Sequence, residues 1–585
     1  MDPIQVFVKH QGKKYNVELD PTTTGETFKY QLYSLTGVEP DRQKILVKGG
    51  QLKDETDLST LGAKPGQTFM MMGTPGEGQA VLTRPKEKTK FVEDMTEAEA
   101  AKADGAIPAG LQNLGNTCYL NSTLQALRAV PELQQELMKY KPSPSDGPSG
   151  ASILGDLRNS GLGGLGASMD LTESLRDLYK QMSETQEGFP PMMFLNALRS
   201  AFPQFAQKSR TGHGYAQQDA EEAWTNIITQ LRQKLKVKST SQGASGSASS
   251  DSQKDISFID KYLAGRFDSV LKCNEPGTED ELAVESSDVF LKLDCHINKN
   301  TNHLRDGIVA GLEEKIEKQS PSLGRDAMYT KTSRISRLPK YLTVHFIRFF
   351  WKRDAGKKAK IMRKVTFPFE LDAVEFCTDD LKKRLIPVRD RLHNLRKDEE
   401  DMQRARKRQR RFEKQEADRK ADAESTGPIG KQQEKKEAEK EHNQGQSAEN
   451  NEDAEMEVFK SDAEYEAEKQ ATILAAKQEL FKLIDPELAA DDGANKSGLY
   501  ELRGVITHQG ASADSGHYTA YVKRQGVIDS KTGKRKEEDG KWWWFNDEKV
   551  TEVDQDKIET LSGGGESHSA LILLYRAIDV PTTEN

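Results

Sequence analysis

The chain has 585 residues, of which 35% are hydrophobic and 30% are charged, and its formal net charge is -8. This length exceeds one ordinary domain, and the mean hydropathy of -0.76 indicates that part of the chain packs no core. The mild charge argues against a nucleic-acid-binding protein. No apolar run approaches the ~18 residues of a membrane-spanning helix, so we expect a multidomain protein that binds neither nucleic acid nor a membrane.

Residues 1–74 predict a small domain of their own. Apolar runs on either side of Gly12 indicate two strands, and apolar residues at helical spacing between Gly25 and Gly37 indicate a helix. Further strands are expected within 44–52 and 68–72. This order resembles the β-grasp fold of ubiquitin, although no free C-terminal Gly-Gly follows, so the domain cannot be conjugated as ubiquitin is.

Several other segments differ from a folded core in composition. Residues 75–104, rich in Pro, Gly, Lys and Glu, predict a flexible linker, and residues 141–151 and 236–254 predict flexible loops. Residues 378–482 are highly charged, and we expect a long solvated helix or coiled-coil arm followed by disorder. The basic run 404–411 suggests nuclear import or RNA binding, but a helix face balanced by nearby acids is the favoured interpretation.

The first cysteine, Cys118, begins a helical pattern. Apolar residues recur at Leu120, Leu124 and Leu127, and the pattern ends at 130–131, where a proline follows. The two preceding residues, Asn116 and Thr117, are capping types. Cys118 is therefore either a small buried thiol or a nucleophile in a first helical turn, where the helix dipole lowers the pKa from ~8.5.

A nucleophilic cysteine needs a base, and the chain has only ten histidines. His517 stands between a Gly/Ser/Ala-rich loop and an alternating strand pattern, whereas His508 is equally consistent with a turn. A second strand, 540–550, ends at Asn546 and Asp547. A simple hairpin would bring either side chain to His517 and let it orient the imidazole ring.

These segments resemble known blocks of one enzyme family. The run "GLQNLGNTCYLNSTLQAL" resembles the cysteine box of the ubiquitin-specific proteases, and "LRGVITHQGASADSGHYTAYVK" with "WWWFNDEKV" resembles their histidine box. Three further blocks lie between them in the family's order, at 215–224, 338–349 and 364–372. The resemblance covers about 105–377 and 485–578, and the ubiquitin-like domain in front narrows it to the proteasome-associated branch.

The resemblance implies an α+β fold. A papain-like thumb–palm–fingers cysteine protease domain is expected at 105–580, preceded by the β-grasp ubiquitin-like domain. Cys118 would be the nucleophile and His517 the general base, while Asn113 would donate to the oxyanion. Asn546 would orient His517, and Asp547 next to it remains the alternative third member.

The resemblance also implies how ubiquitin would be held. Asp219, Phe349, Trp351, His508 and Tyr518 match positions of the channel that binds the ubiquitin tail. Core packing is the alternative for the aromatic residues, and it is the stronger alternative for Phe349. Residues 349–361 and 510–516 match segments that lie over this channel in the proteasome-associated branch.

The expected partners are ubiquitin conjugates and the regulatory particle of the 26S proteasome. Leu46, Met70 and Met72 match the hydrophobic binding face of ubiquitin, and the strand alternation places Met71 inside. The runner-up function is a non-catalytic, ubiquitin-binding regulator of the proteasome, but the intact nucleophile, base and orienting residue favour the enzyme.

No cofactor is expected. Many family members bind zinc through two C-x-x-C pairs in the fingers, but here Cys273 and Cys295 have no near partners, so no structural zinc is predicted. The four cysteines, the last of which is Cys377, suit free thiols in a reducing compartment. Together with the lack of a signal-peptide pattern, this predicts a cytoplasmic and nuclear protein that accompanies the proteasome.

Overall fold

The chain divides into two units, Met1–Met95 and Thr96–Asn585, and each is described by itself. The computed structural model describes residues 4–47, 50–73, 96–101, 106–142, 170–209, 214–238, 255–279, 281–352, 357–425, 462–512, 515–526 and 538–581.

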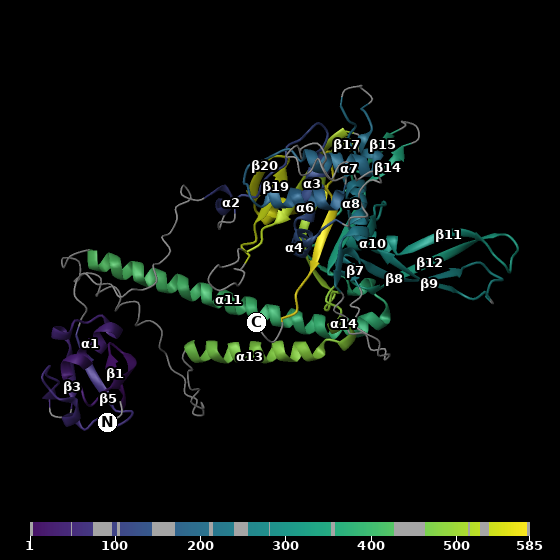
Figure 1. The fold of residues 1–585 in the computed structure, drawn as a ribbon. Coiled ribbons are helices and arrows are strands. Elements are labelled where there is room, and N and C mark those ends of the chain that lie inside the picture. The colour runs from purple at the N-terminus through teal and green to yellow at the C-terminus, as the bar shows by residue number, and fades with distance from the viewer. Residues whose placement is uncertain are drawn as a thin grey trace, which may run out of the picture. The chain divides into compact units, whose positions relative to one another are not determined.

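The first unit is a five-stranded sheet with one helix packed against it (Figure 1). The strand order is β2-β1-β5-β3-β4, and Phe28 and Leu32 of the helix are buried in its core. The helix ends at Gly37, which adopts a left-handed conformation with φ of 67°. The predicted strands and helix are confirmed; their bounds are β1 (Ile4–His10), β2 (Lys13–Leu19), α1 (Gly25–Thr36), β3 (Lys44–Val47), β4 (Gly50–Gln51) and β5 (Thr68–Met72).

One face of this sheet carries an exposed apolar patch. Met70 and Met72 are 51% and 49% exposed, while Met71 between them is buried. Leu46 of β3 pairs with Met70 of β5 across the strands and is 43% exposed. The predicted alternation is therefore confirmed, and the three matched side chains share a solvent-exposed surface.

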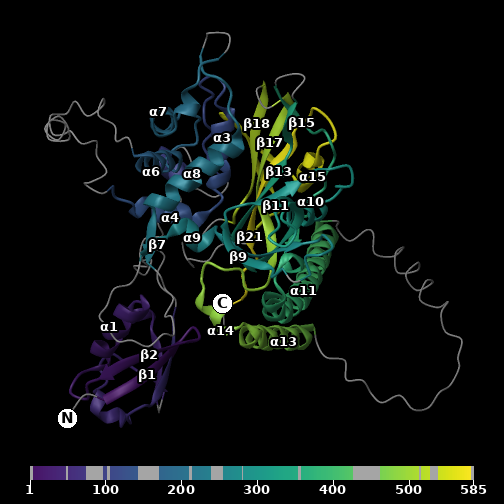
Figure 2. The ribbon, with the colours of Figure 1, turned by 90° about the vertical axis from the view of Figure 1, so that its right-hand side faces the viewer.

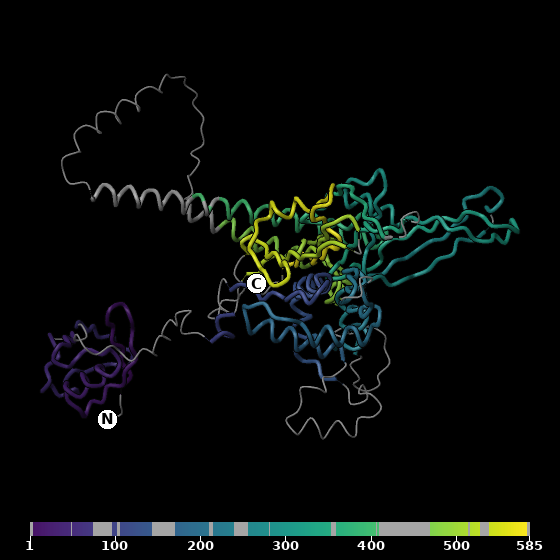
Figure 3. The backbone as a smooth tube through the Cα atoms, turned by 90° about the horizontal axis from the view of Figure 1, so that it is seen from above, coloured from purple at the N-terminus to yellow at the C-terminus, as the bar shows by residue number. Residues whose placement is uncertain are grey.

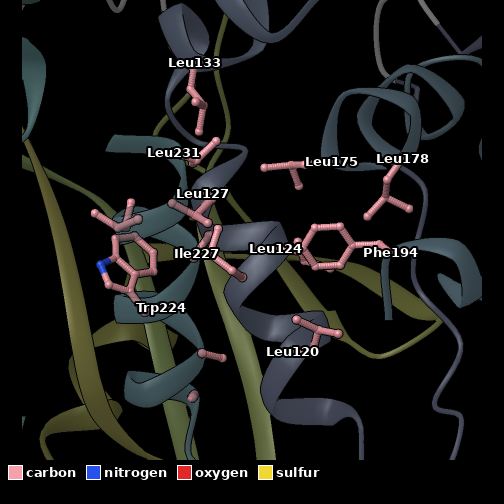
Figure 4. Packing of buried hydrophobic residues seen from close by; sticks show 14 of the residues in the cluster. Leu120, Leu124, Leu127, Leu133, Leu175, Leu178, Phe194, Trp224, Ile227 and Leu231 are labelled. Carbon is pink, nitrogen blue, oxygen red and sulfur yellow. The ribbon is translucent and has the colours of Figure 1, made fainter. Parts of the chain in front are cut away.

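The second unit begins with a layer of helices built around α3. Every residue of α3 is buried, and Leu120, Leu124 and Leu127 pack against helices α6, α7 and α8 (Figure 4). The helical spacing in the sequence is confirmed, because a single apolar stripe faces this cluster. The helices are α3 (Cys118–Leu127), α4 (Pro131–Lys139), α6 (Leu171–Met182), α7 (Met192–Ala201), α8 (Ala220–Lys234) and α9 (Phe258–Tyr262).

A central sheet of ten strands stands beside the helical layer (Figure 2). Its main path is β10-β13-β21-β17-β18-β19-β20. The predicted hairpin is confirmed, since β18 pairs antiparallel with β19. The strands are β10 (Leu293–His296), β13 (Tyr341–Ile347), β14 (Phe349–Lys352), β15 (Lys357–Lys360), β16 (Glu370–Asp372), β17 (Leu499–Ser512), β18 (Ser515–Lys523), β19 (Trp542–Asn546), β20 (Lys549–Val553) and β21 (Ser569–Ala577).

A second, four-stranded sheet projects away from this body as an elongated ribbon (Figure 3). Its order is β11-β12-β8-β9, with β8 (Gly265–Cys273), β9 (Val284–Phe290), β11 (Glu313–Gln319) and β12 (Asp326–Arg337). Cys273 packs in this sheet against Tyr329, whereas Cys295 lies in the separate core around β10. Two helices flank the sheets, α10 (Leu304–Gly311) and α15 (Gln555–Glu559). In the described ranges no three His, Cys, Asp or Glu side chains gather as metal ligands would.

The charged insertion folds in part against the body. Helix α11 (Asp379–Ser425) and helix α13 (Asp462–Leu483) lie side by side (Figures 1 and 2). Leu392 and Leu395 of α11 are buried with Ile473 and Leu480 of α13. Of the two expected forms, the solvated helix is therefore wrong for this part, because a narrow apolar stripe among the charges packs against a second helix, which is closer to the expected coiled-coil arm.

Charged pairs border this helical hairpin. Arg391 of α11 lies 2.5 Å from Glu479 of α13. Arg404, at the start of the basic run, pairs with Glu400 and Asp401 at 3.6 and 3.8 Å, as the charge-balanced interpretation expects. Residues 426–461, where disorder was expected, lie outside the described residues.

Short elements occur where only linkers were expected. Helix α2 (Glu97–Ala100), capped by Thr96, lies in the predicted linker. Strand β6 (Lys236–Lys238), at the start of the predicted loop 236–254, pairs with β7 (Asp255–Ser257). A further helix, α14 (Pro486–Ala490), follows α13. Residues 75–95 and 102–104 of the linker, and residues 143–151 and 239–254 of the two predicted loops, lie outside the described residues.

Among the described helices, none combines the length and the hydropathy that crossing a bilayer requires.

The helical hairpin can be tested with a matched pair of substitutions on α13. Leu480 is completely buried, so Leu480→Ala is expected to cost about 2–4 kcal/mol of hairpin stability. Leu474 is 54% exposed, so Leu474→Ala should change it by less than about 0.5 kcal/mol. Hydrogen exchange of the α13 amides measures both, and equal protection in the two variants would contradict the packing.

Candidate functional site

Cys118 is the first residue of α3 and follows a tightly hydrogen-bonded loop. Asn113 Oδ1 accepts from the amides of Gly115 and Thr117 at 3.0 and 3.2 Å. The Thr117 hydroxyl accepts from the Leu114 amide at 2.9 Å. Thr117 occupies the N-cap position, but its side chain does not bond to the helix. Thr117 therefore does not cap the helix as expected. Its side chain closes the loop 114–117 and so fixes the backbone that leads into Cys118.

A two-residue turn between β19 and β20 contacts this loop. Asp547 in the turn has a φ of 52°, a conformation that aspartate tolerates better than most residues. Its carboxylate accepts from Asn113 Nδ2 at 3.0 Å and from Asn121 Nδ2 at 2.8 Å. Its backbone carbonyl accepts from the Leu111 amide at 3.0 Å. Asp547 thus joins the turn to both the loop and helix α3.

His517 lies on β18, and its ring is bonded to Asn546. Its Nε2–H donates to Asn546 Oδ1 at 2.6 Å, which leaves Nδ1 for another partner. Asn546 ends β19, and Asp547 directs its carboxylate to the two asparagines instead. In this structure Asn546 is therefore the residue that orients His517, while Asp547 orients Asn113.

The Cys118 thiol lies inside the protein, where α3 packs beside β18. Burial raises the pKa of Cys118 to about 11; the Tyr518 backbone amide acts in the opposite direction, and the charge of Asp547 adds to the increase. The expectation of a lowered pKa is therefore wrong. The first turn of α3 is only 2% exposed at Cys118, so desolvation outweighs the helix dipole. The resting thiol is neutral and needs a base.

The rings of three of the five residues matched to the ubiquitin-tail channel pack edge to face in one ring cluster. The His508 ring lies 5.1 Å from the ring of Phe349 and 4.7 Å from that of Tyr518. His508 and Tyr518 are buried, and burial lowers the pKa of His508 to about 3, so this imidazole is neutral. In this state His508 and Tyr518 are packed in the core and do not line an open channel.

The other two matched residues, Trp351 and Asp219, are not part of this ring cluster. Trp351 on β14 is 59% exposed. Asp219 is the N-cap of α8, where its carboxylate accepts from the Glu221 amide at 2.9 Å. Burial raises the pKa of Asp219, and the charge of Lys358 acts against that increase.

The two segments expected to cover the channel are largely strands. Within 349–361, strands β14 and β15 pair antiparallel, and Ser512 of β17 donates from Oγ to the Lys358 carbonyl at 2.8 Å. Lys360 is buried, and its Nζ donates to the His508 carbonyl at 2.6 Å. The two segments are thus fastened to each other; residues 353–356 and 513–514 lie outside the described residues.

Comparison with known proteins identifies the family. The model of the family "Ubiquitin carboxyl-terminal hydrolase" matches residues 109–575, and that of the ubiquitin family matches residues 6–76. The chain belongs to the ubiquitin carboxyl-terminal hydrolase family. It is a deubiquitinating cysteine protease that carries an N-terminal ubiquitin-like domain.

Relatives match the chain over nearly its whole length. The chain is 42% identical to ubiquitin carboxyl-terminal hydrolase 6 of Schizosaccharomyces pombe over 99% of both chains. It is 36% identical to hydrolase 7 of Arabidopsis thaliana, covering 98% of this chain and 99% of that one. It is 32% identical to hydrolase 14 of Caenorhabditis elegans, covering 98% and 93%.

Three residues near the site carried no signal in the sequence. Asn121 is an ordinary polar residue within a helical pattern, yet its amide reaches Asp547. Thr507 looks like any strand threonine, and His568 stands alone after a glycine-rich segment. Only tertiary contacts bring these three residues close to the candidate site.

The Asn113–Asp547 bond predicts coupled effects on catalysis. Asn113→Ala should lower kcat by about 100-fold with little change in KM, because the expected oxyanion donor is lost. Asp547→Ala should lower kcat in the same way, since the Asn113 amide is then unfastened. Hydrolysis of a fluorogenic ubiquitin C-terminal amide measures both.

The two losses should not multiply in the double variant, because they act through one group. Asp554→Ala, at an exposed position just after β20, is the control and should leave kcat unchanged. Multiplying losses would show that the two residues act independently.

The raised pKa of Cys118 predicts slow alkylation of the resting enzyme. Because only the thiolate reacts, iodoacetamide should modify Cys118 more slowly at pH 7.5 than a free cysteine, whose pKa is about 8.5. The rate should still be climbing at pH 10, since the pKa is about 11. Mass spectrometry of the Cys118 peptide measures this rate, and a plateau below pH 8 would be the opposite result.

Proposed function

We propose that this deubiquitinase hydrolyses the bond between the C-terminal glycine of ubiquitin and lysines of substrate proteins, and that it does so on the proteasome. The observation that carries the catalytic part is the 2.6 Å bond from His517 Nε2 to Asn546, which leaves Nδ1 as the basic nitrogen. Removal of ubiquitin before degradation would release it for reuse.

The chemistry follows from these groups. His517 Nδ1 takes the proton of the Cys118 thiol as the sulfur attacks the carbonyl carbon of the terminal glycine. The resulting oxyanion accepts a hydrogen bond from Asn113 Nδ2. This amide has two hydrogens, and only one is engaged by Asp547.

The tetrahedral intermediate then collapses. The C–N bond breaks, and the lysine amine leaves with the proton held on His517, so a thioester joins Cys118 to ubiquitin. Water, deprotonated by His517, attacks the thioester carbonyl. The C–S bond breaks, and ubiquitin is released with a free carboxylate while Cys118 regains its proton.

Docking is assigned to the ubiquitin-like domain. Its exposed patch of Leu46, Met70 and Met72 supports this assignment, because apolar side chains at this exposure suit a partner surface. The partner proposed is the regulatory particle of the 26S proteasome, which implies a cytoplasmic and nuclear enzyme. The partner's identity follows from the resemblance to the proteasome-associated branch.

The free enzyme is proposed to be a resting form. The bonds of Ser512 and Lys360 hold β15 against β17, and the rings of Phe349 and Tyr518 pack against the buried His508. Docking on the proteasome would release these contacts and open the tail channel. The alternative is a non-catalytic regulator, whose bound ubiquitin would signal to the proteasome without turnover.

A ubiquitin probe with a C-terminal electrophile tests the proposal on free and proteasome-bound protein. We expect slow labelling of Cys118 in the free enzyme and labelling at least about 10-fold faster with proteasomes, because the channel then opens. The Leu46→Ala/Met70→Ala/Met72→Ala variant should keep the slow labelling of the free enzyme and lose only the acceleration by proteasomes. Absence of any adduct, or an adduct that survives Cys118→Ala, would favour the non-catalytic regulator.

Tyr30→Ala provides the matched control. Tyr30 is 56% exposed on α1 of the same domain but lies outside the patch. Acceleration by proteasomes should persist in this variant. An equal loss in both variants would show that the patch is not the docking surface.

A further inference from the structure

His568 lies against His517, the proposed base, although it belongs to neither the cysteine box nor the histidine box. It stands between the glycine-rich residues 563–565 and strand β21. Its ring centroid is 6.3 Å from that of His517, and the two planes meet at 71°. This is an edge-to-face contact, a favoured arrangement for two aromatic rings.

Hydrogen bonds hold His568 in this place. Thr507 Oγ1 lies 3.1 Å from His568 Nδ1 and 2.8 Å from Thr519 Oγ1. Both threonines are completely buried, and they pair across β17 and β18. Thr519 follows His517 by two residues on the same strand, so the chain of contacts begins and ends on β18.

The segment that carries His568 is itself fastened. The Glu566 carbonyl accepts from the Gly510 amide of β17 at 2.8 Å, and Ser569 Oγ donates to the His508 carbonyl at 3.5 Å. His568 is thus bracketed by two attachments to β17. These attachments hold the backbone on both sides of His568, and the bond from Thr507 to Nδ1 holds the ring itself.

The charge state of His568 suits a neighbour of the base. Burial lowers the pKa of His568 to about 4, and the charges of His517, Lys360 and Lys557 act in the same direction. The ring is therefore neutral near pH 7. When His517 takes the proton of Cys118 and becomes an imidazolium, it meets no second cation at this contact.

We propose that His568 is a positioning residue: held by Thr507 and Thr519, it fixes the plane of the His517 ring so that Nδ1 faces Cys118 while Nε2 stays on Asn546. This inference rests on the proposed role of His517 as the base. Asn546 alone holds one ring nitrogen and permits rotation about that bond, so a contact on the ring itself supplies the missing restraint.

The test compares kcat and KM for a fluorogenic ubiquitin C-terminal amide. His568→Ala should lower kcat about 10-fold with KM within about twofold, because a small misplacement of the base slows proton transfer without weakening ubiquitin binding. Thr507→Val keeps the side-chain volume but removes the hydroxyl, so it should cause a smaller loss of kcat in the same direction.

The double variant separates positioning from simple loss of structure. Once His568 is absent, the Thr507 hydroxyl has no ring to hold, so the double variant should be no slower than His568→Ala. Thr343→Val is the matched control, since Thr343 is a buried threonine on β13 of the same sheet, away from His517. It should leave kcat unchanged.

Three results would overturn the inference: an unchanged kcat in His568→Ala, a change confined to KM, or losses that multiply in the double variant. If His568→Ala fails to fold, a drop of kcat in the folded Thr507→Val enzyme, absent in Thr343→Val, decides the question. Failure of the proposed function looks different, because the unmodified enzyme would then leave the substrate uncleaved.

Discussion

The contact between the turn at Asp547 and the loop at Gly110–Asn113 is the interaction on which the site depends. A Cβ atom at Gly110 would collide with the carbonyl of Glu548, so the two backbones meet directly. The Asp547 carboxylate then bonds to Asn113 and Asn121. One short turn therefore holds helix α3 with Cys118, the Asn113 side chain and, through adjacent Asn546, the His517 ring, the three groups to which the proposed function assigns the chemistry. These groups come from opposite ends of the catalytic domain.

That alignment has an energetic cost at the thiol. Close packing of α3 against β18 removes water from Cys118, and the nearby Asp547 charge opposes ionisation further. The carboxylate that holds Asn113 thus adds to the effect of burial, and both raise the pKa of Cys118. The proposed mechanism therefore relies on transfer of the Cys118 proton to His517 during attack, which makes the placement of the His517 ring decisive.

Much of the framework could be predicted from local patterns. The stripe of Leu120, Leu124 and Leu127 fixed the helix after Cys118, and the alternation after His517 fixed the hairpin with β19. The pKa of Cys118 could not be predicted, because burial depends on which elements pack over the first turn. The contact between His568 and His517 could not be predicted either, because it depends on where strand β21, which begins just after His568, lies in the sheet.

The charged insertion shows a different limit, and it has a consequence for how the domain is assembled. Leu392 and Leu395 were outnumbered by charges in the sequence, yet they form a core with α13. Arg384, near the start of α11, lies 2.6 Å from Glu487, just after α13. The two ends of the insertion therefore lie close together where they join the catalytic domain. Strands β16 and β17, which flank the insertion, are direct neighbours in the sheet. Packing of α11 against α13 brings the two ends of the insertion together. Strands β16 and β17 can then pair at the entropic cost of closing a short connection instead of a long loop. The insertion is therefore a side branch of the catalytic sheet, and a change in its length leaves the register of β16 and β17 unaltered.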